Sequence, residues 1–189
     1  PLAADLDGDG REEILITRSD ALGGAAHLVL ALRGGRLALK ARGEAVGMGN
    51  RWSHLLGAFD MDGAGRKVLA IETPHLGGRL LALRLDGGRL RERARRSGFT
   101  THAIGSRNMW QFSVMRRGGV AEIVLQERGR GRLAALSLFG KRWTLRWTFP
   151  LAAPARSNFL AGDFNGDGKD DLAFSDESGT VHLLLSRAP

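Results

Sequence analysis

Asp5-Leu6-Asp7-Gly8-Asp9-Gly10-Arg11-Glu12-Glu13 recurs far along the chain as Asp163-Phe164-Asn165-Gly166-Asp167-Gly168-Lys169-Asp170-Asp171. In both nonapeptides, oxygen-bearing side chains stand at positions one, three, five and nine, and glycine stands at four and six. A hard cation such as Ca²⁺ takes six to eight oxygens at about 2.3–2.6 Å, so a tight loop must turn several carboxylates toward one point. Glycine permits that turn. The repeated spacing predicts two calcium-binding loops rather than two solvated turns.

The expected ligands are the four oxygen-bearing side chains of each loop and the backbone carbonyl at position seven. They are Asp5, Asp7, Asp9, Glu13 and the Arg11 carbonyl, and then Asp163, Asn165, Asp167, Asp171 and the Lys169 carbonyl. An EF-hand would need a bidentate Glu at position twelve and a helix on each side. Position twelve is Ile16 or Phe174, within a short apolar stretch. Each loop is therefore predicted to join two strands, with calcium in a structural role.

Each loop belongs to a longer unit that occurs about four times, with a period of about 50 residues. The units align on Ile14, Leu69, Ile123 and Leu172. Each has an apolar stretch before that position and another after it. In three units a glycine turn (Gly34-Gly35, Gly87-Gly88, Gly140) leads to a fourth stretch, as in hairpins. Four short strands per unit are typical of a propeller blade.

The predicted fold is an all-β propeller of about four blades, each with four antiparallel strands, the last blade incomplete. The expected blades are 1–48, 49–100, 101–150 and 151–189, either as one closed domain of 1–189 or as part of a larger propeller, and we favour the partial propeller. Ala, Leu and Arg also favour helices. The 27 glycines interrupt every helical period, so strands are the better interpretation.

At these residues the chain resembles the FG-GAP/VCBS repeat, the blade of integrin-alpha-like β-propellers. The similarity is strong at GDFNGDGKDDLAF (162–174) and at ADLDGDGREEILI (4–16). The other two units depart from the metal motif, and the residues that break it are Ala64 and Val68 in the second unit and Val114, Arg116 and Gly118 in the third. Asp60, Asp62 and Glu122 remain. We therefore expect no more than two calcium ions per chain.

The resemblance implies a noncatalytic, calcium-stabilised binding or adhesion module of a bacterial periplasmic or extracellular protein. Propellers of this family commonly have seven blades, so further blades or another chain could complete the assembly.

The amino-acid composition limits the classes of partner that the sequence predicts. The net charge of +8 and pI of about 11.2 predict attraction to polyanions, and an acidic glycan or a protein is the expected ligand. No nucleic-acid recognition motif is present. The chain has no cysteine and no apolar run of the ~18–20 residues that a membrane span needs. The densest basic run, Arg89–Arg96, is interpreted as a solvated outer strand.

Strand direction places the calcium loops on one face and the connections between units on the other. There the repeats place the expected ligand-binding residues, Arg51, Trp52, Arg107, Trp110 and Arg156. Arginine beside an aromatic ring can pair with an anionic group while the ring stacks on a sugar. The alternative is that the tryptophans wedge between blades.

Enzyme signatures are sparse. The five histidines have no metal-ligand spacing, and the chain has no GxSxG, P-loop or dinucleotide motif. Asp176 and Glu177 are adjacent in what is predicted to be a polar turn. A noncatalytic module is the first interpretation. The alternative is the propeller domain of a carbohydrate-active enzyme, a polysaccharide lyase or hydrolase, acting on an acidic glycan.

Overall fold

The computed structural model describes residues 1–49 and 51–186, and every helix or strand assigned in them is a β-strand, which confirms the all-β prediction. No helix in those residues is long and apolar enough to cross a membrane. The chain divides into two compact units, Pro1–Ser97 and Gly98–Pro189.

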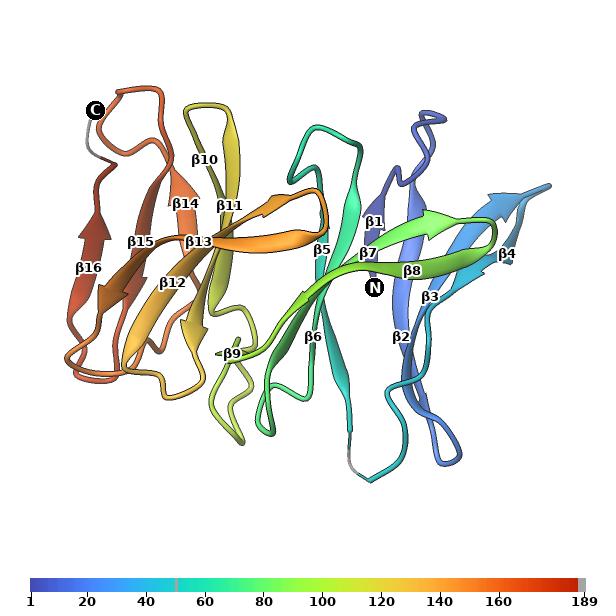
Figure 1. Ribbon diagram of the computed structural model, residues 1–189, viewed down its shortest axis with the longest axis horizontal. Helices are drawn as coiled ribbons and strands as arrows, with labels where there is room; N and C mark the ends of the chain where they lie inside the picture. Colours follow the sequence, from blue (N-terminus) through green and yellow to red (C-terminus); the bar gives the residue numbers. More distant parts are fainter. Residues whose placement is uncertain (50, 187–189) are drawn as a thin grey trace. The chain divides into compact units, whose positions relative to one another are not determined.

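The strands of the first unit form one sheet with the order β1-β2-β3-β4-β8-β7-β6-β5 (Figure 1). Its first set comprises β1 (Leu2–Ala4), β2 (Glu13–Asp20), β3 (Gly24–Arg33) and β4 (Arg36–Arg42). Its second set comprises β5 (Ser53–Phe59), β6 (Lys67–Glu72), β7 (Arg79–Asp86) and β8 (Arg89–Arg96). Consecutive strands within each set pair antiparallel, and the sets meet at one parallel pair, Arg42 opposite Arg89.

The second unit contains two further sheets. One has the order β10-β11-β12-β13, with β9 paired to β11, and the other has the order β14-β15-β16. The bounds are β9 (Phe99–Thr100), β10 (Phe112–Arg117), β11 (Val120–Glu127), β12 (Arg132–Phe139), β13 (Arg142–Pro150), β14 (Leu160–Gly162), β15 (Asp171–Ser175) and β16 (Val181–Leu184). Apart from β9, these strands overlap the stretches that the repeats predicted. The division into four propeller blades stays a prediction.

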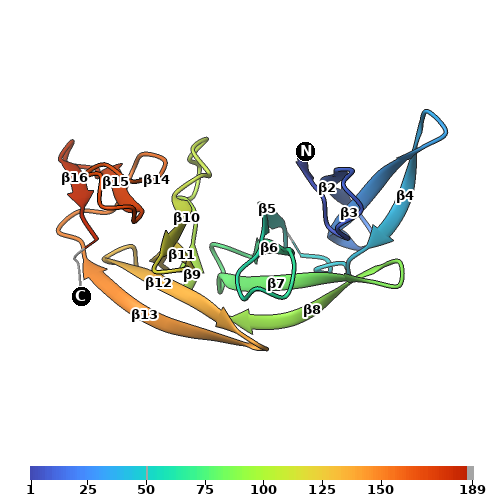
Figure 2. The same cartoon turned by 90° about the horizontal axis from the view of Figure 1, so that it is seen from above.

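The turn between the third and fourth strand of a set repeats in detail. Gly34 and Gly35 have φ of 55° and 76°, and Gly87 and Gly88 have 51° and 80°, as two-residue hairpin turns require. A β-bulge follows in each of these hairpins and in β12–β13, at Val29/Leu30, Ala82/Leu83 and Ala135/Leu136. Bulges increase local twist. In Figure 2, β10 is accordingly seen almost end-on while β12 and β13, in the same sheet, lie across the view.

The third repeat unit differs from the sequence alignment. Val114 and Arg116, which were aligned with metal-ligand positions, lie inside β10. Gly118 and Gly119, with φ of 56° and 79°, form a two-residue turn that leads directly into β11. The glycine pair adopts positive φ without steric cost, so a tight hairpin replaces the long loop here.

Each unit has its own apolar core. In the first it includes Leu15, Val29, Leu55, Val68 and Leu81, so both strand sets contribute. In the second, residues of β11 and β12 pack with residues of the last sheet, and the buried members are Met115, Val124, Leu133, Ala135, Ala155, Phe159, Leu172 and Phe174.

A buried polar chain links the two strand sets of the first unit. Ser53 Oγ donates to the Ile71 carbonyl at 3.3 Å and lies 2.8 Å from His27 Nε2, while Thr17 Oγ1 lies 3.0 Å from His27 Nδ1. Because the serine proton is engaged, Nε2 is the donor to Ser53 and Nδ1 accepts from Thr17. Burial, and then the neighbouring His54, lowers the pKa of His27 to about 4. The imidazole is therefore neutral in the folded protein at pH 7.

This geometry predicts acid sensitivity between pH 6.5 and pH 4. The unfolded chain binds a proton at the ordinary histidine pKa near 6.5, but folded His27 does not until about pH 4. The contribution to stability is complete above pH 6.5 and falls by up to ~3 kcal/mol as pH drops through this window. Urea unfolding of the parent and of His27→Gln at pH 7.5 and 4.5 should show a smaller loss in the variant. Equal losses would contradict the assignment.

Candidate metal loops and ligand surfaces

The two nonapeptides adopt the same hydrogen-bonded conformation. Asp5 accepts from the amides of Gly8 and Gly10, at 2.7 and 3.0 Å. Asp163 accepts from Gly166 and Gly168, at 2.7 and 2.8 Å, and these bonds, that of Gly168 first, lower the pKa of the Asp163 carboxyl. The position-nine carboxylate closes each loop by accepting the position-two amide, Leu6 to Glu13 at 2.9 Å and Phe164 to Asp171 at 3.1 Å. The shared spacing thus yields a shared turn.

Three acidic side chains converge in the first loop. Asp5, Asp7 and Glu13 each offer an oxygen, and these oxygens all lie within 4.8 Å of one another. Oxygens bound to one calcium ion lie no farther apart than about twice the 2.3–2.6 Å bond length, so this group fits such an ion. Asp9, also predicted as a ligand, instead pairs with the Arg11 guanidinium at 2.9 Å, which lowers the pKa of the Asp9 carboxyl.

Lys40, on β4, brings a positive charge to the same carboxylates. Its Nζ lies 2.6 Å from Asp7 Oδ2 and 2.6 Å from Glu13 Oε1. Glu13 is 2% exposed, so this contact neutralises a buried charge. The sequence pattern did not identify Lys40, because β4 follows the loop by a long interval and pairs with β3.

In the second loop, Asp171 is fully buried. Its Oδ1 accepts the amide of Ser186 at 2.7 Å, so a segment after β16 helps to satisfy it. Asn165 Oδ1 accepts the Asp167 amide at 2.9 Å, and Asp167 Oδ1 accepts the Lys169 amide at 3.0 Å. No ion pair to Asp163, Asp167 or Asp171 occurs within residues 1–49 and 51–186.

The expected ligand-binding residues of the first unit lie beside a strained turn. Arg51 is exposed and Trp52 is partly buried. The Trp52 carbonyl accepts the amide of Thr73, whose φ of 45° is unusual for a β-branched residue. The Trp52 ring lies 6.1 Å from the His75 ring and 6.4 Å from that of His54. Trp52 is thus largely engaged with its own unit.

The expected ligand-binding residues of the second unit share one surface. The Arg156 carbonyl accepts from Asn108 Nδ2 at 2.6 Å and from Gln111 Nε2 at 3.0 Å, which brings the 107–111 segment beside Arg156. Arg107, Trp110 and Arg156 are all exposed. Trp110 stacks on Phe112 with 5.4 Å between ring centroids. The structure therefore brings these three predicted residues together.

A buried glutamine holds that surface to the sheet behind it. Gln126, on β11, is fully buried; its Nε2 donates to Gln111 Oε1 at 2.7 Å, and its Oε1 accepts the Ala155 amide at 3.0 Å. Both segments that carry the exposed arginines are thus anchored by one side chain.

Replacing Gln126 by Leu should destabilise the second unit. The change keeps the side-chain volume but leaves the Ala155 backbone amide and the Gln111 side-chain oxygen Oε1 buried without their partner, which should cost about 2–4 kcal/mol together. Denaturant unfolding and hydrogen exchange of the Ala155 amide would measure the loss. Glu127→Gln, which weakens the surface pair with Arg132, is the matched control and should cost under ~1 kcal/mol. Equal effects would show that the network contributes nothing.

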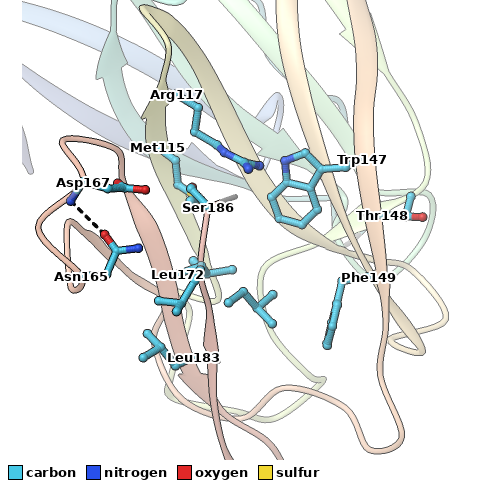
Figure 3. Close-up of a pocket in the computed structure, with 12 residues that line it drawn as sticks. Met115, Arg117, Trp147, Thr148, Phe149, Asn165, Asp167, Leu172, Leu183 and Ser186 are labelled. Carbon is cyan, nitrogen blue, oxygen red and sulfur yellow. Dashed lines mark hydrogen bonds between the residues drawn. The ribbon is translucent and has the colours of Figure 1, made fainter. Parts of the chain in front are cut away.

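A cavity of about 710 Å³ lies between the two sheets of the second unit (Figure 3). Its wall includes Trp147, Phe149, Leu172 and Leu183, and Arg117 lies at its edge with its guanidinium carbon 5.8 Å from the centre of the Trp147 ring. Trp147 Nε1 donates to Glu122 at 2.7 Å. Asn165 and Asp167 of the second nonapeptide also line the cavity. Sequence analysis missed it, because facing sheets create it.

The Asp176-Glu177 pair forms a turn, as predicted. Asp176 accepts from the amides of Ser178 and Thr180, at 2.9 and 3.0 Å, and lies 2.8 Å from His182 Nε2. The bond to His182, followed by that to Ser178, lowers the pKa of Asp176 to about 2. Glu177 pairs with Arg130 at 2.9 Å. Asp176 is thus held by partners within its own turn and the strand that follows it, and Glu177 by an arginine from the β11–β12 turn of the same unit.

Two arginines of the basic run on β8 form ion pairs. Arg91 pairs with Asp86, and Arg95 makes two bonds to Glu92, at 2.7 and 2.6 Å. Arg91, Glu92 and Arg95 border a second cavity of about 760 Å³ in the first unit, together with Glu44, Glu72 and Arg79. Its wall carries both charges, so it is not a purely basic surface.

Comparison with known proteins supports the repeat. Residues 155–184 match the family model of the FG-GAP repeat, which confirms the resemblance seen in the sequence for that segment. No curated protein matches the chain.

Two solved structures are similar in fold. The rhamnogalacturonan lyase PL11 of Bacillus licheniformis has a TM-score of 0.57 and 19% identity, over 94% of this chain and 40% of the lyase. The exotype rhamnogalacturonan lyase YesX has a TM-score of 0.59 and 16% identity, over 95% of this chain and 39% of that enzyme. The chain therefore spans about two-fifths of the length of both. At these identities the similarity concerns the fold, which is β-propeller-like.

Proposed function

We propose that the chain is a calcium-stabilised, noncatalytic β-propeller module that binds a protein or an acidic glycan in the bacterial periplasm or outside the cell. The observation that carries this proposal is the pair of nonapeptide loops with matching hydrogen bonds, each closed by a buried carboxylate, Glu13 or Asp171. Carboxylate-rich loops at hairpin ends are suited to a hard cation that holds two strands together. The metal would stabilise the hairpins, and exposed residues elsewhere would contact the partner.

In the first loop calcium would share its carboxylates with Lys40. The ammonium contacts Asp7 and Glu13, two of the three converging acids, so metal binding must displace or repel it. Within the described part of the chain, no lysine or arginine side chain forms an ion pair with the carboxylates of the second loop. We therefore expect the second loop to bind calcium more tightly than the first.

Calcium should raise the melting temperature relative to EDTA, because an ion that binds only the folded state adds about 2.7 kcal/mol per site at a hundredfold excess over Kd. Calorimetric titration should give at most two equivalents. Asp167→Asn, in the second loop, should weaken the tighter site. Asp86→Asn, at an exposed ion pair, is the charge-matched control and should leave calcium binding unchanged. Superimposable melting curves with and without calcium would refute the proposal.

The partner surface is proposed at the exposed arginines beside tryptophan. Arg107, Trp110 and Arg156 gather on the second unit, and Arg51 with Trp52 on the first. A guanidinium can bind a carboxylate or sulfate in bidentate fashion, and an indole can stack on a sugar ring. An acidic glycan presents both features.

The double variant Arg51→Ala/Arg107→Ala should weaken binding to acidic glycans without changing calcium-dependent melting. Binding by the parent should also weaken with salt, since exposed charges are screened within about 8–10 Å at 0.1–0.15 M. The matched control Arg91→Ala/Arg132→Ala removes the same net charge from residues already paired to acids. If both double variants lose affinity for the glycan equally, the protein attracts it through its total charge and not through the proposed surface. Affinity chromatography or titration on a glycan panel would measure the difference.

The second candidate function is the propeller domain of a carbohydrate-active enzyme that acts on an acidic glycan. The observation in its favour is the fold similarity to two rhamnogalacturonan lyases. A glycosidase needs two carboxylates in one site. The described wall of the second unit's cavity contains one carboxylate, Asp167, together with Arg117. Release of an unsaturated product from rhamnogalacturonan, followed by ultraviolet absorbance, would favour this alternative over a noncatalytic module.

A further inference from the structure

The loop between β5 and β6 carries a lysine where the two nonapeptides carry a carboxylate. Glu13 stands opposite Ala4 and Asp171 opposite Gly162, in each case the residue that precedes the first aspartate of the loop. In the second repeat unit the residue before Asp60 is Phe59, and Lys67 stands opposite it. This register corrects the sequence alignment, which placed Val68 there. The closing position thus holds a cation instead of an anion.

The Lys67 side chain is turned into its own loop. Its Nζ contacts Asp62 Oδ1 and donates to the Gly65 carbonyl at 2.8 Å, and the side chain is 4% exposed. Asp60 Oδ1 accepts the Gly63 amide at 2.8 Å, the counterpart of the Asp5–Gly8 and Asp163–Gly166 bonds. The beginning of the turn is therefore retained, although Ala64 has no oxygen to offer at position five.

A metal ion does not fit this loop. Asp60 and Asp62 remain, but the third side chain of the converging group is now an ammonium, which repels a divalent cation strongly at such a distance. The ammonium also supplies what a metal would have supplied. It is a compact positive charge, with donors that reach a carboxylate and a backbone carbonyl at once.

We propose that Lys67 is a tethered cation that takes the place of a metal ion, so that the β5–β6 loop folds without calcium. The positions at which the chain has lysine instead of arginine agree with this role. The chain has 28 lysines and arginines, of which only Lys40, Lys67, Lys141 and Lys169 are lysine, and two of these four direct Nζ to loop carboxylates. A guanidinium is a broad planar fork, whereas an ammonium suits a small ring of oxygens. The inference does not depend on calcium at the other two loops.

A double-mutant cycle tests the charge role. Lys67→Met keeps the length of the side chain but leaves the Asp62 carboxylate, whose side chain is only 12% exposed, without its cation, so the melting temperature should fall by on the order of 10 °C in both calcium and EDTA. Asp62→Asn/Lys67→Met removes both charges and should recover a substantial part of that loss. Lys141→Met, at an exposed lysine, is the control and should melt within a degree or two of the parent. A Lys67→Met variant that melts like this control, or a double variant no more stable than Lys67→Met, would overturn the proposal.

A gain-of-site experiment tests the equivalence with a metal. Ala64→Asp/Lys67→Glu restores oxygens at the fifth and closing positions of the loop. Calcium titration should then give one equivalent more than the parent, and the melting difference between calcium and EDTA should widen. If the folded variant binds no more calcium ions than the parent, the proposal that Lys67 takes the place of a metal ion is overturned. If the variant does not fold even with calcium, the double-mutant cycle still decides the role of Lys67. Asp60→Asn should leave the calcium stoichiometry of the parent protein unchanged. A lower stoichiometry in this variant would overturn the claim that the loop is metal-free.

Discussion

In the first, second and last repeats, a buried charge at the end of the first hairpin is the constraint on which the acidic loop depends. Glu13, Lys67 and Asp171 face the residue that precedes their loop, and each is at most 3% exposed. Such a group is tolerated only where partners replace its hydration. The loop backbone supplies some of those partners, such as the Leu6 and Phe164 amides and the Gly65 carbonyl. Satisfying the charge therefore shapes the loop.

The repeats meet the same requirement in different ways. In the first, the Lys40 ammonium approaches Glu13, whereas in the last the amides of Phe164 and Ser186 satisfy Asp171. In the third, whose loop is reduced to a glycine turn, Glu122 persists and accepts from the Trp147 indole. The hairpin scaffold is thus maintained while the partner of the buried charge changes from one repeat to the next. Surfaces at the opposite ends of the strands, such as that of Trp110 and Arg156, are anchored separately through Gln126.

The repeated turns and strands could be predicted from the sequence because each depends on residues that are close together in the chain. Glycine pairs at Gly34-Gly35 and Gly87-Gly88 can adopt positive φ, and the apolar stretches around them have the length of strands. The carboxylate spacing likewise predicted the paired turns of the two nonapeptides. Alignment of the repeats by residue type failed where a loop differs in length from its counterparts. It placed Val68 at the closing position, and it extended a loop through Val114 and Arg116, which continue a strand.

By itself, the sequence determined the succession of strands within each repeat, the two acidic turns and the all-β class, because hydrogen bonds between neighbouring segments and backbone preferences suffice for them. Only the tertiary structure decided which distant groups meet. Lys40 reaches the first loop from another strand, Gln126 joins Gln111 to Ala155, and a cavity opens beside Trp147. These contacts depend on how twisted sheets pack, and no spacing along the chain encodes them. Under the proposed function, the Lys40 ammonium and a calcium ion would compete for the carboxylate oxygens of Asp7 and Glu13, and that competition too is set by a tertiary contact.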